Sequence, residues 1–302
     1  MKTYDIVILT DQKHANPNTI DDYTKNVITE DALVANALGQ LGLKVVRLAW
    51  SNPNFDWSST KAVLFRTTWD YFDNFSAFSH WLDKVAKVTT LINSEALIRW
   101  NIDKHYLLDL QQNGIQIADT LFIKSGTSKS LKDLHNDTGW TETVLKPCVS
   151  GSARHTYKLN PDTIAKHETI FKDLIAKETM MLQPFQHRIV SDGEMSIMVF
   201  NGQFTHAVLK KAKAGDFRVQ DDFGGSIHNY TPTEAEIEFA IKTVNACAEL
   251  PLYARVDIFN DNSGKIALAE LELIEPELWF RKHPKAAVIL AEAIKGKIEQ
   301  LQ

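Results

Sequence analysis

The sequence predicts an α/β and α+β protein, in which a domain built on a parallel sheet precedes segments with antiparallel hairpins. Strand and helix patterns alternate over the first hundred residues, which is typical of a parallel sheet with helices on both faces. Later in the chain, the Asn201-Gly202 turn joins two strand patterns and is a strong hairpin signal. The 302 residues, 44% of them apolar, are enough to build more than one core.

The first domain is expected over residues 1–98. Its first strand, over residues 6–9, is followed by a polar loop through Asp22 and by a helix whose apolar stripe ends at Gly42. The remaining patterns predict two strands, a helix and a closing strand, over residues 44–48, 62–65, 75–85 and 90–93. This alternation favours a Rossmann-like parallel sheet.

Two further subdomains are expected, over residues 99–182 and 183–302. The patterns of the first predict a helix, two strands, a helix and a strand, over residues 101–110, 117–124, 143–147, 161–176 and 180–185. Those of the second predict strands, a helix, a hairpin and a last helix, over residues 195–200, 203–210, 231–244, 253–275 and 284–301. Its first helix is expected to begin with a capping box over Thr231-Pro232-Thr233-Glu234, with the proline in the first helical position.

The composition excludes several classes of partner. The net charge is −5 and basic residues form no cluster, so there is no electrostatic basis for binding nucleic acid or an anionic membrane. No run approaches the roughly 18 apolar residues of a membrane span, and the N-terminus lacks a signal-peptide cleavage site. Cys148 and Cys247 could form at most one disulfide, which fits a reducing compartment. We therefore expect a cytoplasmic protein that acts on small molecules.

The predicted hairpin near the C-terminus carries the sharpest group of charged residues. Because side chains alternate across a strand, Arg255 and Asp257 share one face, and Glu270 and Glu272 share one face of the partner strand. Three carboxylates among apolar neighbours are costly without a compensating cation, and hard oxygen ligands suit Mg²⁺. A solvated hairpin face, on which Arg255 pairs with a carboxylate, is an equally open interpretation.

Three other segments carry residues that suit a bound nucleotide. Lys146 ends an apolar strand before the small-residue loop 148–154, whose backbone N–H groups could approach a phosphate. Segment 183–185 leaves backbone groups unpaired beside its proline, as recognition of an adenine edge requires, and Glu194 follows as a carboxylate for ribose hydroxyls. The basic run 210–218 could hold a transferring phosphoryl group. Each segment taken singly is also compatible with ordinary surface structure.

The order and spacing of these residues resemble the ATP-grasp superfamily of carboxylate-amine ligases over most of the chain. Longer strings resemble the branch that contains the cyclo-ligase of cycloserine biosynthesis, an O-ureido-serine cyclo-ligase, with bacterial glutathione synthetases as more distant relatives. These strings are Arg66–Tyr71, Asn93–Lys104, Gly215–Arg218 and Glu270–Pro276. The resemblance implies an ATP-grasp fold, in which two α+β lobes enclose ATP behind the N-terminal domain.

The resemblance also implies a role for each matching residue. The residues that would bind nucleotide phosphates or ribose are Lys104, Lys146 and Glu194. Those that would close over the phosphates are Ser150, Gly151 and Ser152, and those that would form the adenine hinge are Gln183, Pro184 and Phe185. The cations that would neutralise the γ-phosphate and an acyl phosphate are Lys211, Arg218 and Arg255. The implied magnesium ligands are Asp257, Glu270 and Glu272.

Substrate residues are placed by position. Arg66, Thr68, Trp69 and Asp70 follow a predicted strand of the parallel sheet, at the edge where such sheets bind ligands. Glu275 follows the implied magnesium ligands. Packing of Trp69 between domains is the open alternative.

The implied activity is ATP-dependent activation of a small-molecule carboxylate as an acyl phosphate, which an amine then attacks with release of ADP and phosphate. The implied cofactors are ATP and two Mg²⁺ ions, with Mn²⁺ as a substitute, and a homodimer is compatible with the resemblance. A small-molecule kinase on the same scaffold and an ATP-binding sensor without turnover stay open as alternatives. Ligation of two molecules and cyclisation of one are not distinguished.

Overall fold

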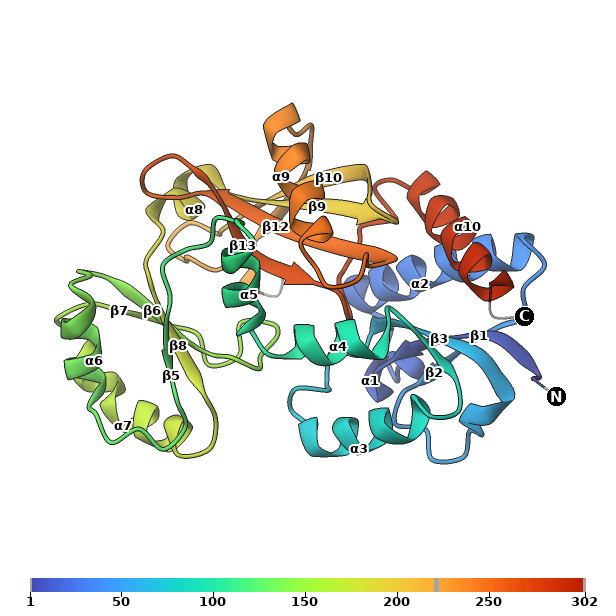
Figure 1. Ribbon diagram of the computed structural model, residues 1–302, viewed down its shortest axis with the longest axis horizontal. Helices are drawn as coiled ribbons and strands as arrows, with labels where there is room; N and C mark the ends of the chain where they lie inside the picture. Colours follow the sequence, from blue (N-terminus) through green and yellow to red (C-terminus); the bar gives the residue numbers. More distant parts are fainter. Residues whose placement is uncertain (1, 220–222, 301–302) are drawn as a thin grey trace.

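The computed structural model describes residues 2–219 and 223–300, which form three sheets and the helices that cover them. Figure 1 shows the N-terminal domain at one end, a small lobe around residues 121–184 at the other, and the sheet of residues 194–272 above and between them. The first sheet is parallel and the other two are antiparallel, so the predicted combination of α/β and α+β structure is confirmed.

The N-terminal sheet has the strand order β2-β1-β3-β4. Its elements are β1 (Tyr4–Thr10), α1 (Gln12–Ala15), α2 (Asp22–Gln40), β2 (Val45–Ala49), the short helical turn η1 (Trp57–Ser59), β3 (Thr60–Thr67), α3 (Phe75–Val85) and β4 (Thr90–Ile92). The strands and the two long helices follow the predicted order. The single turn α1 lies in the predicted polar loop, where the Asp11 carboxylate accepts a hydrogen bond from the His14 N–H and so caps it.

The small lobe has the strand order β5-β8-β6-β7. The elements between residues 95 and 184 are α4 (Glu95–Ile102), α5 (Tyr106–Gln112), β5 (Leu121–Ile123), α6 (Leu131–Thr138), β6 (Thr143–Pro147), β7 (Tyr157–Leu159), α7 (Ile164–Ile175) and β8 (Met180–Pro184). The continuous helix predicted over residues 101–110 is wrong. Asp103 takes an extended conformation and its carboxylate accepts the His105 N–H, which ends α4 and starts a new turn.

The remaining sheet has the strand order β11-β10-β9-β12-β13. The elements beyond residue 186 are α8 (His187–Asp192), β9 (Glu194–Phe200), β10 (Gln203–Lys211), β11 (Ser226–Tyr230), α9 (Glu234–Asn245), β12 (Tyr253–Asn260), β13 (Ile266–Glu272) and α10 (Lys285–Glu299). The predicted capping box is displaced by two residues, because Thr233 caps α9 and Glu236 completes the box. Of the predicted last helix, Leu301 lies outside the described residues.

The N-terminal domain is fixed to the C-terminal sheet by packing and by one carboxylate. Apolar residues of β1, β3 and α2 form a common core with residues of β9, β10 and α10. At its edge the Glu30 carboxylate accepts backbone N–H groups from Phe280 and Arg281, at 2.8 and 2.9 Å. Within the described part of the chain, we find no helix with the length and apolar character needed to cross a membrane.

His206 gives this junction a predictable response to acid. Its Nε2 donates to the Leu278 carbonyl at 2.7 Å, and its ring stacks on His283 with centroids 5.0 Å apart. Burial lowers the pKa of His206 from 6.5 to about 4, so the unfolded chain binds its proton more tightly than the folded one. Stability is therefore complete above pH 6.5 and decreases as the pH falls toward 4, by about 2 kcal/mol between pH 6.5 and pH 5.

We expect His206→Gln to remove this part of the acid dependence. Urea denaturation at pH 7.5 and pH 5 should give a smaller loss of unfolding free energy in the variant than in the wild type. An equal loss in both proteins would assign the acid sensitivity to other groups.

Candidate active site

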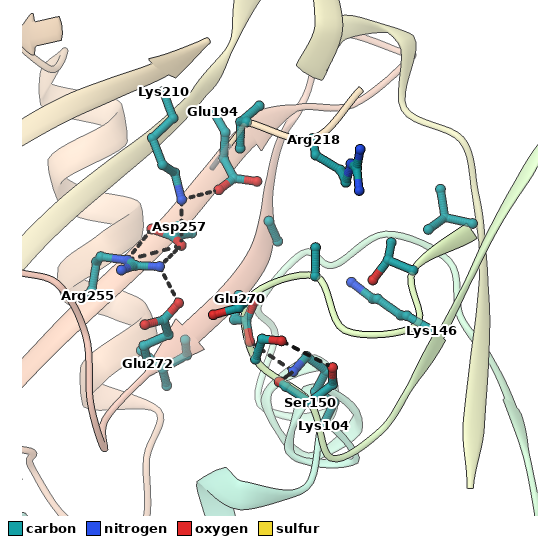
Figure 2. A pocket seen from close by; sticks show the side chains of 18 of the residues that line it. Lys104, Lys146, Ser150, Glu194, Lys210, Arg218, Arg255, Asp257, Glu270 and Glu272 are labelled. Carbon is teal, nitrogen blue, oxygen red and sulfur yellow. Dashed lines mark hydrogen bonds and ion pairs between the residues drawn. The ribbon is translucent and has the colours of Figure 1, made fainter. Parts of the chain in front are cut away.

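A cavity of about 270 Å³ lies where the three sheets approach one another. Its wall combines Trp69 of the N-terminal domain, Lys146 and Phe185 of the small lobe, and Asp257 and Glu270 of the C-terminal sheet. Each of these comes from the end of an element or the loop that follows it, except the pair on the β12–β13 hairpin. Figure 2 shows that the charged side chains of this wall point toward one another.

The β12–β13 hairpin supplies the acidic floor of the cavity. Its antiparallel register places Asp257 opposite Glu270 and Arg255 opposite Glu272, so each predicted pair shares a face and the two pairs lie together on the cavity side. Directly opposed side chains of an antiparallel pair have Cβ atoms about 5 Å apart. The carboxylates are thus close neighbours because of strand pairing, and each is met by a cation.

Asp257 is the most heavily bonded of these carboxylates. It is 2% exposed and accepts from Ser196 at 2.6 Å, from Lys210 at 2.9 Å and from Arg255 at 2.9 Å. Burial would raise its pKa, but Arg255 and Lys210 outweigh burial and hold the pKa of Asp257 well below its ordinary value. Arg255 also pairs with Glu272 (Figure 2). The carboxylate is therefore ionised at any physiological pH.

The cation at this point is Lys210 and not Lys211, which corrects the prediction. Lys211 is exposed at the end of β10 and does not line the cavity, whereas Lys210 is 4% exposed and bridges Glu194 at 2.5 Å to Asp257. A strand turns successive side chains to opposite faces, so only one of the two adjacent lysines can face the hairpin. The register of β9 with β10 sets Lys210 opposite Glu194, so Lys210 is the lysine that faces the hairpin.

Two lysines face the hairpin from the other side. Lys104 is buried; its Nζ lies 3.0 Å from a Glu270 carboxylate oxygen and donates to the Ser150 carbonyl at 2.7 Å. Lys146, at the end of β6, lines the same cavity but forms no ion pair with any described residue. Burial, followed by the neighbouring Lys104, lowers the pKa of Lys146 even though Glu270 opposes this. Lys146 is thus a cation with no ion-pair partner in the described part of the chain, which is what a site for an anionic ligand provides.

The loop after Lys146 lies along the cavity, and the residues predicted to close over the phosphates, Ser150, Gly151 and Ser152, line it. Ser152 and Ala153 adopt left-handed conformations, with φ of 47° and 52°, so part of this loop is strained. Gly151 packs against the ring of Phe72, and a Cβ on it would lie 2.6 Å from the Phe72 Cε1 atom. The loop thus touches the N-terminal domain through a position where only glycine fits.

Gly151→Ala is therefore expected to displace the loop and raise the KM for ATP by about 10-fold, since small misplacements at a reacting site are costly. Phe72→Leu in the same chain should restore much of the affinity by making room for the methyl group. Gly296→Ala is the matched control, because a Cβ there meets nothing within 4 Å. An unchanged KM in Gly151→Ala would mean that the loop does not contact the nucleotide.

The residues predicted to bind adenine and ribose line another part of the cavity wall. Gln183, Pro184 and Phe185 line the cavity at the end of β8, and Glu194 begins β9 close by. Removal from water raises the pKa of Glu194, although Lys210 acts against it. Arg218 also lines the cavity, paired with Asp216 and stacked over the ring of Phe223 at 3.8 Å.

The N-terminal residues divide into two groups, and three of them need correction. Trp69 lines the cavity, as does Glu275, whose backbone carbonyl accepts the Trp69 indole N–H at 2.9 Å. Arg66, Thr68 and Asp70 do not line it. Arg66 and Thr68 are at most 1% exposed, and Asp70 accepts the indole N–H of a tryptophan at the end of β2. The strand end does reach the site, but Arg66 and Thr68 are turned into the core and Asp70 is held by its bond to the tryptophan.

The donor set fits both a divalent cation and a polyphosphate. Three carboxylates on adjacent strands offer hard oxygen ligands. If Lys104 and Lys146 bind an anionic ligand, the cations that remain beside these carboxylates no longer balance their charge, and a divalent cation would supply the difference. Asp103, His105 and Cys148 form another group with metal-ligand chemistry, outside the cavity wall. Its thiol is buried, and burial raises the pKa of Cys148 to about 12, which disfavours the thiolate that binds metals.

Comparisons with known proteins identify the family. A RimK-like ATP-grasp domain matches residues 108–273, and the N-terminal domain of D-cycloserine synthetase DcsG matches residues 6–93. The cycloserine biosynthesis protein DcsG of Streptomyces lavendulae is 26% identical over 267 residues, which cover 83% of this chain and 87% of that protein.

Solved structures show the same fold. The crystal structure of D-cycloserine synthetase DcsG matches with a TM-score of 0.83 at 23% identity, over 97% of this chain and 99% of that one. D-alanyl-alanine synthetase A from Vibrio cholerae O1 biovar eltor matches with a TM-score of 0.69 at 15% identity, over 99% of both chains. The chain therefore belongs to the RimK-like ATP-grasp family, as an ATP-dependent ligase that forms ADP and whose N-terminal domain is similar to that of D-cycloserine synthetase.

Proposed function

We propose that the enzyme transfers the γ-phosphoryl group of ATP to the carboxylate of a small molecule and that an amine then attacks the resulting acyl phosphate. The observation that carries this proposal is the convergence, in one cavity, of Lys146, which forms no ion pair within residues 2–219 and 223–300, with the Asp257, Glu270 and Glu272 carboxylates. A site of this composition neutralises a polyphosphate from one side and holds its metal from the other.

The cavity residues divide by chemistry. We assign the phosphates of ATP to Lys104, Lys146 and the loop at Ser150–Ser152, the adenine to Gln183–Phe185 and the ribose to Glu194. Magnesium, which accompanies ADP in a solved structure of the ATP-grasp ligase PsnB, is assigned to Asp257, Glu270 and Glu272, with two ions bound and Mn²⁺ as a substitute. Bound there, magnesium supplies positive charge that offsets charge developing on the phosphates. We also propose that the two ATP-grasp subdomains begin at residues 99 and 183.

The chemistry needs little beyond positioning and charge. A carboxylate is a poor electrophile because its leaving group would be oxide, whereas a mixed anhydride with phosphate has a good leaving group. Arg255 and Arg218 line the cavity as fixed cations that can neutralise the acyl phosphate. Lys210 supports the same region by holding Asp257 and Glu194 in place.

Trapping with hydroxylamine tests this function without knowing the natural amine. The protein is incubated with ATP, Mg²⁺, hydroxylamine and a panel of carboxylic acids, and we expect a hydroxamate, ADP and free phosphate in equal amounts for the acids that fit. Transfer of phosphate to a stable phosphoester, with no hydroxamate, would replace the ligase by a kinase. Nucleotide binding with no product from any acid would reduce the protein to a sensor.

A further inference from the structure

Among the described residues that line the cavity, Glu275 differs from every other carboxylate. The other five each pair with a lysine or an arginine; they are Glu194, Asp257, Glu270, Glu272 and Glu277. Glu275 forms no ion pair with any residue in the described ranges 2–219 and 223–300. A partly buried carboxylate without a cation is costly, so its retention in a cavity points to a ligand that brings the missing charge.

Side-chain hydrogen bonds hold the backbone around Glu275 in place. Three successive carbonyls each accept one side-chain hydrogen bond: Ile274 from the Tyr253 hydroxyl at 2.8 Å, Glu275 from the Trp69 indole at 2.9 Å, and Pro276 from the Arg66 guanidinium at 3.0 Å. The last two donors belong to the N-terminal domain, and the first to β12. This arrangement fixes where the Glu275 side chain enters the cavity, which is how a binding group is pre-organised.

The surroundings of Glu275 suit a cation. Tyr71, Trp69 and Tyr23 line the same cavity as Glu275, and the Trp69 and Tyr23 ring centroids are 6.2 Å apart. Aromatic faces attract ammonium groups. Burial, followed by the charges of Glu272 and Glu270, raises the pKa of Glu275 to about 8, and Lys104 only partly offsets this. Without a ligand the position therefore favours the protonated acid at neutral pH, and a bound cation would favour the carboxylate.

We propose that Glu275 binds a protonated amino group carried by the acid that the enzyme activates. This inference rests on the proposed function and adds the charge of its substrate. An amine held as an ammonium ion has no free lone pair, so the group bound by Glu275 is a recognition group and not the attacking nucleophile. Glu275 and the phosphate-side residues Lys104 and Lys146 line one cavity, so the amino group and the activated carboxylate share that cavity.

Paired acids test the inference in the hydroxylamine assay. The panel contains α-, β- and γ-amino acids, with both enantiomers of the chiral ones. Each amino acid is paired with the acid in which hydrogen replaces the amino group. The wild type should prefer the better amino acid over its deaminated partner by about 100-fold in kcat/KM, the order expected for a buried charged hydrogen bond. Glu275→Gln should lose most of that preference while its affinity for ATP with Mg²⁺ stays within about 3-fold of wild type.

A second variant and a control separate charge from structure. Glu275→Asp keeps the charge and should keep the preference at a reduced rate, and Glu238→Gln, on the exposed face of α9, should behave as wild type. Equal use of amino and deaminated acids by the wild type, or an equal loss on both in Glu275→Gln, would overturn the inference and leave the ligase intact. Absence of hydroxamate from every acid would overturn the proposed function, and the inference with it.

Discussion

Glu270→Gln is expected to lower turnover by about 100- to 1,000-fold with little loss of fold, the range found when one pre-organised charge contact is removed from a transition state. Gln keeps the shape of the side chain but loses a charge that a divalent cation requires. Lys104 would keep its bond to the Ser150 carbonyl, and the Glu270 side chain is 33% exposed, so we expect a cost of only about 1 kcal/mol in stability.

The magnesium dependence identifies the cause of this loss. Rate measurements over a range of Mg²⁺ concentrations should show that Glu270→Gln needs more metal for half-maximal activity. A thermal melt beside Glu238→Gln, which changes an exposed glutamate of α9 in the same way, checks the fold. Wild-type turnover with an unchanged metal requirement in Glu270→Gln would remove the metal assignment.

Much of the acidic floor could be predicted from the sequence because it depends on strand alternation and one hairpin. Arg255 and Asp257 are two residues apart, as are Glu270 and Glu272, and a strand places such pairs on one face whatever the details of the turn. The same reasoning predicts the parallel sheet, since its strands and helices are long enough to be strongly periodic.

The position of Lys210 could not be predicted in this way. A regular hairpin closed at Asn201-Gly202 would set Leu209 opposite Glu194, but the register shifts by one residue between Phe204 and His206. This irregularity turns Lys210, and not Lys211, toward Glu194. A bulge of one residue has no clear sequence signal, yet it decides which lysine serves the site.

Contacts between segments that are far apart in the sequence could not be predicted either. Arg66 and Trp69 were expected at the site because they follow the predicted strand over residues 62–65, but their side chains bond the backbone carbonyls of Pro276 and Glu275. More than 200 residues separate the partners of each bond. Only the packing of the N-terminal domain on the C-terminal sheet places them together, and that packing depends on the common core beneath β3 and α10.

Lys146→Met is expected to weaken ATP binding and to stabilise the protein without nucleotide, two effects of opposite sign from one cause. The loss of a cation that faces the phosphates should raise the Kd for ATP with Mg²⁺ by about 100-fold, which corresponds to about 3 kcal/mol. Titration of ATP by calorimetry measures this. Lys166→Met, on the exposed face of α7, removes a lysine in the same lobe as a control and should leave the Kd unchanged.

The gain in stability follows from proton linkage. Because burial and then Lys104 lower the pKa of Lys146 in the folded state, the unfolded chain binds that proton more tightly, and at neutral pH this favours unfolding. Methionine removes the proton-binding group, so the variant should unfold at a higher urea concentration at pH 8. The difference should shrink as the pH rises toward 10.5, where the unfolded lysine also loses its proton. A variant that binds ATP poorly and is also less stable at pH 8 would show that Lys146 supports the fold, and its role as an uncompensated cation reserved for the nucleotide would be wrong.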